Sequence, residues 1–214
     1  MTQNLWPLDE HALAYLGWAD AIPHRTEGEA EVLAHLPEPL GRVLDLGCGD
    51  GRLMALVRAA RRRAGGTAVD FSPAMLSAAV DRFSGDGDVD VIDHDLDVPL
   101  PDLGRFEAVV SSFAIHHVDD RRKEALYGEV FDRLLPGGTF LNLEHVASPT
   151  PRLHARFMAE LDMDGADEDP SNKLAPVEAQ LGWLRAIGFE DVDCHWKWRE
   201  MALLGGVRPA GDAG

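Results

Sequence analysis

The sequence has few cysteines and few basic residues. Its two cysteines, Cys48 and Cys194, predict no disulfide framework and fit a reducing cytoplasm. Lys and Arg number 20 against 37 Asp and Glu, which gives a formal net charge of -17. A nucleic-acid binder needs a basic surface for phosphates, whereas the basic clusters here, residues 61–63 and 121–123, are expected on solvated helix faces. The charge therefore predicts no nucleic-acid partner.

The sequence also lacks long apolar runs. No run approaches the length of a membrane-spanning helix, and residues 1–9 lack the basic and apolar regions of a signal peptide. We therefore expect a cytoplasmic protein with no membrane contact. Its 214 residues and 45% hydrophobic content fit one α/β domain with modest additions.

A glycine-rich stretch, residues 43–53, organises the rest of the chain. A short apolar run typical of a buried parallel strand leads to Gly47, Gly49 and Gly51, and a helical pattern follows. Such a strand, turn and helix bring bare backbone N–H groups close to a ligand. The turn suits a nucleoside. Arg52 occupies the last small-residue position of the dinucleotide fingerprint, which argues against an NAD-dependent oxidoreductase.

An acidic residue follows at the distance expected for a ribose-binding group. The strand predicted at residues 67–70 ends on Asp70, and nucleotide-binding α/β units place a carboxylate about 20 residues beyond the turn. Asp70 is alternatively a helix N-cap, but Ser72 is better placed for that role. Phe71 and Met75 either cover the nucleoside base or pack in the core.

Four later segments accompany the glycine stretch in order and spacing, at residues 68–72, 94–97, 106–118 and 135–139. Together the five segments resemble the motifs of class I S-adenosylmethionine-dependent methyltransferases. The resemblance is firm over residues 40–146 and loose over the flanks. It implies an enzyme that binds S-adenosyl-L-methionine and transfers the methyl group to a small-molecule acceptor by in-line displacement.

The resemblance implies an α/β fold with a Rossmann-like, seven-stranded, mostly parallel sheet. An antiparallel C-terminal hairpin completes the sheet, and helices cover both faces. A single methyltransferase domain over residues 1–214 then divides into four parts. They are an N-terminal helical cap (1–39, with a helix expected at 9–19), a cofactor-binding core (40–146), a helical lid insertion (147–176) and a C-terminal helix with hairpin (177–208).

Local signals add detail to this plan. Thr26 and Glu29 have the spacing of a capping box at a helix start. Gly65 and Gly66 are expected to stop the helix that follows the glycine turn. Asp119 is expected to cap the helix predicted over the residues that follow it. We expect no metal site, because no other carboxylates are spaced to share a metal with Asp119.

The resemblance also assigns residues to the cofactor. Asp70 meets the ribose, Asp95 accepts the adenine amino group, and the Leu96 backbone N–H meets an adenine ring nitrogen. Ser112 is expected at the methionine end, where Arg25 either binds the methionine carboxylate or forms a surface salt bridge. The expected cofactor residues are Arg25, Asp45, Gly47, Cys48, Gly49, Asp70, Phe71, Met75, Asp95, Leu96 and Ser112.

Candidates for catalysis come from the histidines. An oxygen or nitrogen acceptor that must lose a proton needs a base, and histidine suits that role near pH 7. His116, His117 and His145 fall where the implied fold places the pocket, and Glu144 is the acidic alternative. Each alternatively packs in the core or only binds substrate, and methyl transfer need not use a base. Glu144 and His145 are expected at the pocket rim.

The later part of the chain offers further candidates. Trp183, Trp196 and Trp198 either line an aromatic substrate pocket or pack against the sheet edge, and packing is favoured. The acidic stretch at residues 162–169 predicts a mobile loop of the kind that closes over substrates.

Other functions stay open at this point. Ile22 and Pro23 and the hairpin at residues 190–207 loosely resemble the enzyme that makes carboxy-S-adenosylmethionine, which consumes the cofactor without methylating an acceptor. A non-enzymatic S-adenosylmethionine-binding scaffold or sensor is a third possibility, against which the histidines argue. The sequence leaves the acceptor and the oligomeric state open, a homodimer being one option.

Overall fold

The computed structural model of the protein describes residues 22–163 and 168–211, together with residues 6, 8, 10, 12, 14 and 17. The helix expected at residues 9–19 and the middle of the expected acidic loop fall largely outside these residues. Among the described residues, no helix is long and apolar enough to cross a membrane.

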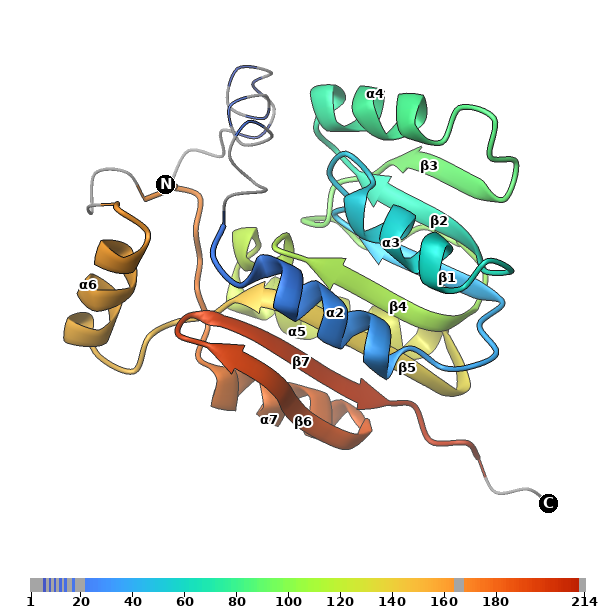
Figure 1. Ribbon diagram of the computed structural model, residues 1–214. Helices are drawn as coiled ribbons and strands as arrows, with labels where there is room; N and C mark the ends of the chain where they lie inside the picture. Colours follow the sequence, from blue (N-terminus) through green and yellow to red (C-terminus); the bar gives the residue numbers. More distant parts are fainter. Residues whose placement is uncertain are drawn as a thin grey trace.

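A seven-stranded sheet forms the centre of the molecule (Figure 1). Its strands are β1 (Arg42–Leu46), β2 (Gly65–Asp70), β3 (Val89–Asp93), β4 (Phe106–Ser112), β5 (Leu134–His145), β6 (Glu190–Trp198) and β7 (Met201–Val207). Their order is β3-β2-β1-β4-β5-β7-β6, and β7 runs antiparallel to both of its neighbours. The predicted Rossmann-like sheet with its antiparallel hairpin is confirmed.

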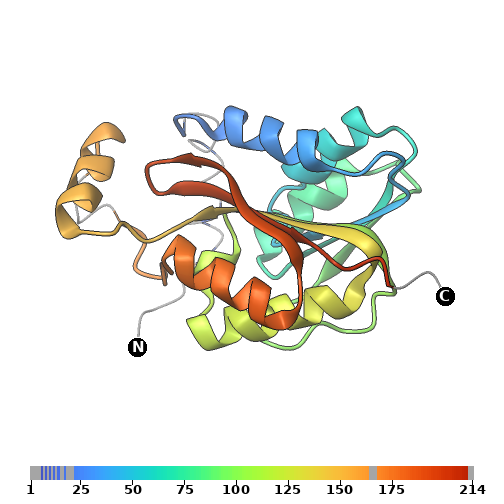
Figure 2. The ribbon, with the colours of Figure 1, turned by 90° about the horizontal axis from the view of Figure 1, so that it is seen from below.

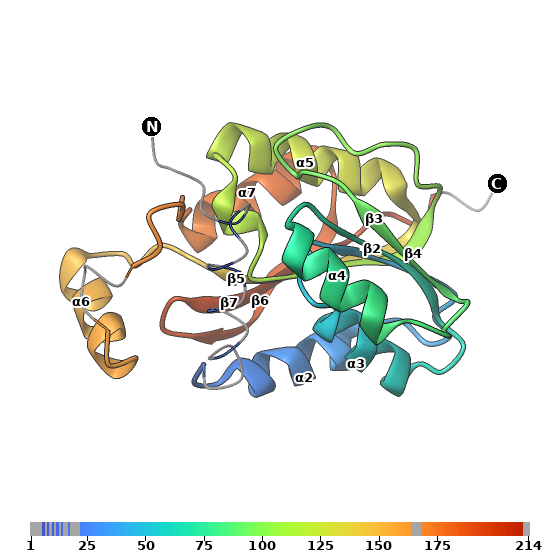
Figure 3. The ribbon, with the colours of Figure 1, turned by 90° about the horizontal axis from the view of Figure 1, so that it is seen from above.

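Helices cover both faces of this sheet (Figures 2 and 3). On one face lie α2 (Arg25–His35), α3 (Arg52–Ala60) and α4 (Pro73–Arg82), and on the other lie α5 (Asp120–Arg133) and α7 (Val177–Ile187). A further helix, α6 (Pro151–Glu160), stands beside the hairpin, and a short 3₁₀ helix, η2 (Ile115–His117), follows β4.

Side chains along β1 point alternately to the two faces of the sheet, so each face has its own part of the hydrophobic core. Val43 is fully buried with Met54 and Val57 of α3, whereas Leu44 is fully buried in the cluster that contains Tyr127 of α5. Successive side chains of a strand point to opposite faces, so an almost continuous apolar run is what a strand covered on both sides requires.

The predicted capping box at the start of α2 is wrong. His24, in a left-handed conformation with φ of 61°, occupies the N-cap position, and no side chain makes a cap hydrogen bond there. Glu29 is unavailable to reach back to the helix start, because its carboxylate binds Arg25 and Arg52 instead. The capping prediction for Asp119 is confirmed, since its side chain accepts a hydrogen bond from the backbone N–H of Arg122.

The prediction that Gly65 and Gly66 stop a helix is also wrong. α3 already ends at Ala60, and the two glycines are the first residues of β2, where they pair with Arg42 and with Val43 of β1. A Cβ at Gly66 would lie 2.6 Å from the Met54 side chain. Glycine here allows α3 to pack closely on the sheet without a shift of the Met54 side chain.

Candidate functional site

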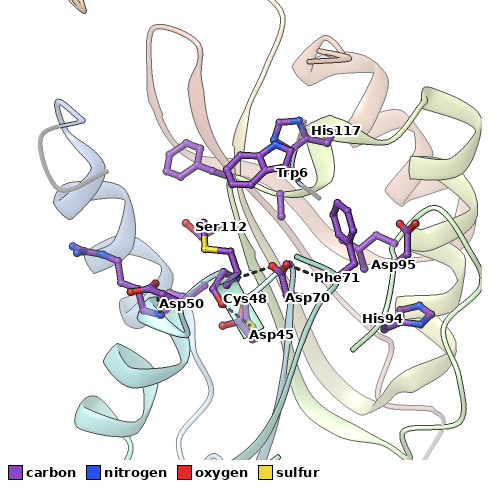
Figure 4. A pocket seen from close by; sticks show the side chains of 18 of the residues that line it. Trp6, Asp45, Cys48, Asp50, Asp70, Phe71, His94, Asp95, Ser112 and His117 are labelled. Atoms are coloured by element: carbon purple, nitrogen blue, oxygen red, sulfur yellow. Dashed lines mark hydrogen bonds between the residues drawn. The ribbon is translucent and has the colours of Figure 1, made fainter. Parts of the chain in front are cut away.

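A cleft of about 870 Å³, open to solvent, lies at the carboxyl ends of β1, β2 and β4 (Figure 4). Open α/β sheets bind ligands at this edge of the sheet. Every residue that the sequence assigns to the cofactor lines the cleft, namely Arg25, Asp45, Gly47, Cys48, Gly49, Asp70, Phe71, Met75, Asp95, Leu96 and Ser112.

The glycine turn presents main chain to this cleft. Gly47 has a φ of 64°, and a Cβ there would lie 2.2 Å from the Cβ of Ala114. Gly49 has a φ of 56°, and a Cβ there would meet only the Met75 sulfur, at 3.8 Å. Gly47 is thus fixed by packing as well as conformation, whereas Gly49 keeps space open above the turn. The backbone N–H of Cys48 donates to the Val69 carbonyl at 2.9 Å, which ties the turn to β2.

Asp70 joins the ends of β1 and β2. One carboxylate oxygen accepts the N–H of Gly49 at 2.9 Å, and the other accepts those of Phe71 at 2.8 Å and Ser72 at 2.9 Å. Burial raises the pKa of Asp70, and these three hydrogen bonds oppose the rise. The expected cap at Ser72 is wrong in one respect: Ser72 occupies the N-cap position of α4, but its side chain makes no cap hydrogen bond.

Asp45 places a buried carboxylate beneath the turn. Its Oδ2 accepts the N–H of Met54 at 3.1 Å, and its Oδ1 is buried with no hydrogen-bond partner in the described part of the chain. Burial raises the pKa of Asp45 to about 7, and the charges of Asp70 and Asp50 add to the rise. Burial also raises the pKa of the Cys48 thiol. A carboxylate oxygen with no internal donor favours a cationic or hydrogen-donating ligand group.

Two guanidinium groups lie at another part of the cleft. Arg25 Nε donates to Glu29 Oε1 at 2.9 Å, and Arg52 donates to both oxygens of the same carboxylate, at 2.7 and 2.9 Å. Arg25 and Glu29 are buried, so the alternative of a surface salt bridge for Arg25 does not hold. Both arginines line the cleft and can face a ligand carboxylate.

The opposite part of the cleft contains Phe71, His94 and Asp95 (Figure 4). The ring of Phe71 stands beside Asp95, with Asp70 between them and the glycine turn (Figure 4). Leu96 and Met75 are buried and also line the cleft, so Met75 belongs both to the core and to the cleft wall. An aromatic ring, apolar side chains and a partly exposed carboxylate together suit a heteroaromatic base with an amino group.

Of the four candidates for catalysis, His117 lines the cleft, while His116, Glu144 and His145 do not. His116 is buried with its Nδ1 2.6 Å from Oε1 of the fully buried Glu144. Burial raises the pKa of Glu144 to about 7 and lowers that of His116 well below its usual value. His145 Nε2 instead lies 3.0 Å from Glu200 Oε2.

The expectation that Glu144 and His145 form the pocket rim is therefore wrong. β5 continues through His145, where it pairs with Met201 of β7, so Glu144 still lies within the sheet. Its second oxygen accepts a hydrogen bond from Asn142 at 3.3 Å, and Asn142 also donates to the Tyr127 hydroxyl at 3.2 Å. The polar residues of β5 form an internal network rather than a binding surface.

His117 is half-buried at the cleft wall. Its Nδ1 lies 2.9 Å from Ser171 Oγ, and its ring centroid lies 5.3 Å from that of Trp6 and 4.0 Å from that of His116. Burial lowers the pKa of His117 well below its usual value, and the neighbouring His116 lowers it further. His117 is thus a neutral imidazole at the edge of a cleft.

The cleft also contains residues that the sequence did not assign individually to the cofactor or to catalysis. All except Trp6 fall within the motif segments named above. Membership of those segments was the signal that could have indicated their place in the site, and Trp6 had no such signal. These residues are Trp6, Asp50, Arg52, Leu53, His94, Asp97, Phe113, Ala114 and Val118.

The three late tryptophans lie outside the cleft lining. Trp183 packs near Tyr127, with 6.4 Å between ring centroids, and Trp198 packs near Phe157 at 5.9 Å. Trp196 packs against two of the core clusters. The favoured packing role agrees with these contacts. In the part of the chain that the structure describes, no group of three or more His, Cys, Asp or Glu residues is arranged to hold a metal ion.

Comparisons with known proteins agree with this architecture. A family model described as a methyltransferase domain matches residues 43–138. The chain is 32% identical over 191 residues to the ubiquinone/menaquinone biosynthesis C-methyltransferase UbiE of Desulfotalea psychrophila, covering 81% of this chain and 75% of that protein. It is 28% identical over 167 residues to the carboxy-S-adenosyl-L-methionine synthase of Aeromonas salmonicida, covering 77% of this chain and 60% of that protein.

Solved structures share the fold at lower identity. Human N-acetylserotonin methyltransferase, in complex with S-adenosylmethionine, matches with a TM-score of 0.70 at 16% identity. The match covers 96% of this chain but 58% of that one, so the chain spans a little over half the length of this solved structure.

Proposed function

The chain belongs to the class I S-adenosylmethionine-dependent methyltransferases, and on that premise we propose that it methylates a small-molecule acceptor by in-line displacement. The observation that carries the proposal is the cleft at the glycine turn. There, open space above Gly49, the acceptor oxygens of Asp70 and the buried Oδ1 of Asp45 lie along one wall. The name of the C-methyltransferase relative, which refers to quinone biosynthesis, also supports a small acceptor.

The residues present fit the groups of S-adenosyl-L-methionine. Asp45 suits the ammonium of its methionine part, and Arg25 with Arg52 suits the carboxylate. A carboxylate offers about four acceptor positions, and Asp70 already uses three for backbone N–H groups, which leaves room for one ribose hydroxyl. Asp95 and the Leu96 N–H then face the adenine edge.

The sulfonium of the cofactor supplies the reactive methyl group, so the protein contributes position rather than electrons. Holding a nucleophile about 3 to 3.5 Å from the methyl carbon contributes most of the rate gain expected for such a transfer. Trp6 and His117, which lie together at the cleft wall, are placed to contact the acceptor (Figure 4). His117 is the candidate to take a proton from it.

Two other assignments fit the observations less well. The match to carboxy-S-adenosyl-L-methionine synthase is shorter and less identical than the match to the C-methyltransferase. A binding scaffold needs no histidine at the cleft wall.

We further propose that the enzyme acts in the cytoplasm. The net charge of -17 argues against a nucleic-acid acceptor.

Calorimetry with S-adenosylhomocysteine, followed by transfer of labelled methyl from S-adenosylmethionine, tests the proposal. We expect the wild type and Asp93→Ala to bind S-adenosylhomocysteine and Asp70→Ala to bind it weakly, since Asp93 is the exposed equivalent at the end of β3. Label should enter the small-molecule fraction of an extract. Absence of binding, or label recovered in RNA or protein, would overturn the proposal.

A further inference from the structure

His117 is held by two groups from a segment far away in the sequence. Its Nδ1 lies 2.9 Å from the hydroxyl oxygen of Ser171, which is buried. The same hydroxyl oxygen lies 2.7 Å from Asp169 Oδ1. The backbone N–H of Ser171 also donates to Asp169 Oδ1, at 2.8 Å. The three side chains therefore form a connected chain of hydrogen bonds that ends at the cleft.

The direction of these hydrogen bonds follows from the proton count. A serine hydroxyl has one proton, and an ionised carboxylate can only accept. The backbone N–H bound to Asp169 favours the ionised form, so the Ser171 proton goes to Asp169. Ser171 Oγ must then accept from His117 Nδ1–H. His117 then carries its lone pair on Nε2, a nitrogen that makes no hydrogen bond within the described part of the chain.

The segment that contains Ser171 is fixed to the sheet at several points. The N–H of Lys173 donates to the His116 carbonyl at 2.9 Å, and the N–H of Ala147 donates to the Ala175 carbonyl at 3.0 Å. The buried Lys123 ammonium also donates to the Lys173 carbonyl. These bonds hold the segment that contains Ser171 close to η2.

We propose that Ser171 and Asp169 are positioning residues that hold His117 as the Nδ1–H tautomer, and that the acceptor is a hydroxyl or N–H compound whose proton passes to Nε2. This inference rests on the proposed methyl transfer. As the acceptor's O–H or N–H bond breaks, its proton binds Nε2. The freed electron pair of the acceptor forms the bond to the methyl carbon, and the carbon–sulfur bond breaks with its pair on sulfur. The imidazolium then returns its proton to water.

The charges around His117 favour its neutral form. Burial and the neighbouring His116 and His145 lower its pKa, while Asp169 and the Ser171 backbone act in the opposite direction. A neutral imidazole accepts a proton at the ring nitrogen that carries none.

The tautomer can be measured without knowing the acceptor. Long-range ¹H–¹⁵N correlation spectra of protein labelled with ¹⁵N-histidine report which ring nitrogen carries the proton, and His117→Gln identifies the His117 signals. We expect a protonated Nδ1 and an unprotonated Nε2 in the wild type. Ser171→Ala should move the population toward Nε2–H, and Ser171→Thr, which keeps the hydroxyl, should restore the Nδ1–H form. A wild-type ring protonated on Nε2 would overturn the inference.

A matched control separates this effect from general disturbance. Ser148 donates to Glu200 beside His145, so Ser148→Ala removes a similar serine-to-carboxylate bond outside the cleft and should leave the His117 signals unchanged. With an acceptor from the labelling screen, Ser171→Ala should lower kcat by up to about 100-fold, because the His117 ring is no longer held in place, while S-adenosylhomocysteine binds unchanged. Unchanged kcat would refute the positioning role. Loss of S-adenosylhomocysteine binding by the wild type would refute the proposed function instead, whatever the tautomer.

Discussion

The two ends of the cleft are built in different ways. At the glycine turn, main chain supplies much of the contact, and Asp70 alone receives three backbone N–H groups. At His117, the hydrogen bond comes from one side-chain atom of a distant segment, Ser171 Oγ. The end at the glycine turn is formed by the strands of the sheet and the turns between them. The end at His117 depends on a segment outside the sheet. Cofactor binding and acceptor chemistry should therefore respond to different substitutions.

The largest effect is expected at the His117 end of the cleft. His117→Gln should lower turnover about 100- to 10,000-fold, the usual contribution of a positioned base, while S-adenosylhomocysteine affinity stays unchanged. Steady-state kinetics and calorimetry measure the two effects separately. His145→Gln is the control, because His145 contacts Glu200 and lies outside the cleft lining. If both variants lost cofactor affinity, the two ends would not be separable.

A substitution at the first end should affect folding. Gly47→Ala should lower the free energy of unfolding by about 2 to 4 kcal/mol, because its Cβ would overlap Ala114 and its φ is positive. Urea unfolding measures this change. Gly87→Ala, where a Cβ meets nothing within 4 Å, should be almost neutral. Equal stability of the two variants would show that the turn can relax.

A smaller effect is expected at Asp70. Asp70→Asn should weaken S-adenosylhomocysteine binding about 10- to 100-fold, since hydrogen bonds to a charged group are lost or weakened. Titration calorimetry measures this affinity. The control is Asp93→Asn, because the carboxylate of Asp93 is exposed in the wild type. Turnover at saturating cofactor should change little. A large fall in kcat with unchanged affinity would place Asp70 in the acceptor chemistry instead.

The smallest effect concerns pH. The folded pKa of Asp45 is about 7, above the ordinary 3.8, so the folded protein binds a proton that the unfolded chain releases. This stabilisation is complete below about pH 4 and is lost as the pH rises through 7. Glu144, raised to about 7, acts in the same direction. Asp45→Asn should therefore show a shallower fall in unfolding free energy between about pH 4 and 7 than the wild type, measured in urea.

The sheet and the first end of the cleft were predictable because their signals are local. Gly47 and Asp70 are recognisable from spacing, since a strand, a turn and the next strand fix their separation in space. Gly65 misled the prediction because a glycine after a helix resembles a C-cap, while its actual role depends on a neighbouring strand. Local patterns carry no information about which segment packs on them.

The second end was only partly predictable. His117 was named with His116, but which of the two faces the cleft depends on η2, and its partner Ser171 lies 54 residues away. Glu144 was misplaced because a polar residue near a strand end resembles a rim residue until the length of the antiparallel pairing is known. Long-range hydrogen bonds decide these roles, and no spacing rule encodes them.

The position of β7 has a consequence for the order in which parts of the protein can fold during synthesis. This strand is the last in sequence yet lies between β5 and β6, so β5 keeps an unpaired edge until residues 201–207 leave the ribosome. Glu200, which begins the same segment, supplies the carboxylate for His145, Ser148 and His154. The nucleoside end of the cleft can thus assemble during translation, while the hydrogen bonds to Glu200 must wait for synthesis of the hairpin.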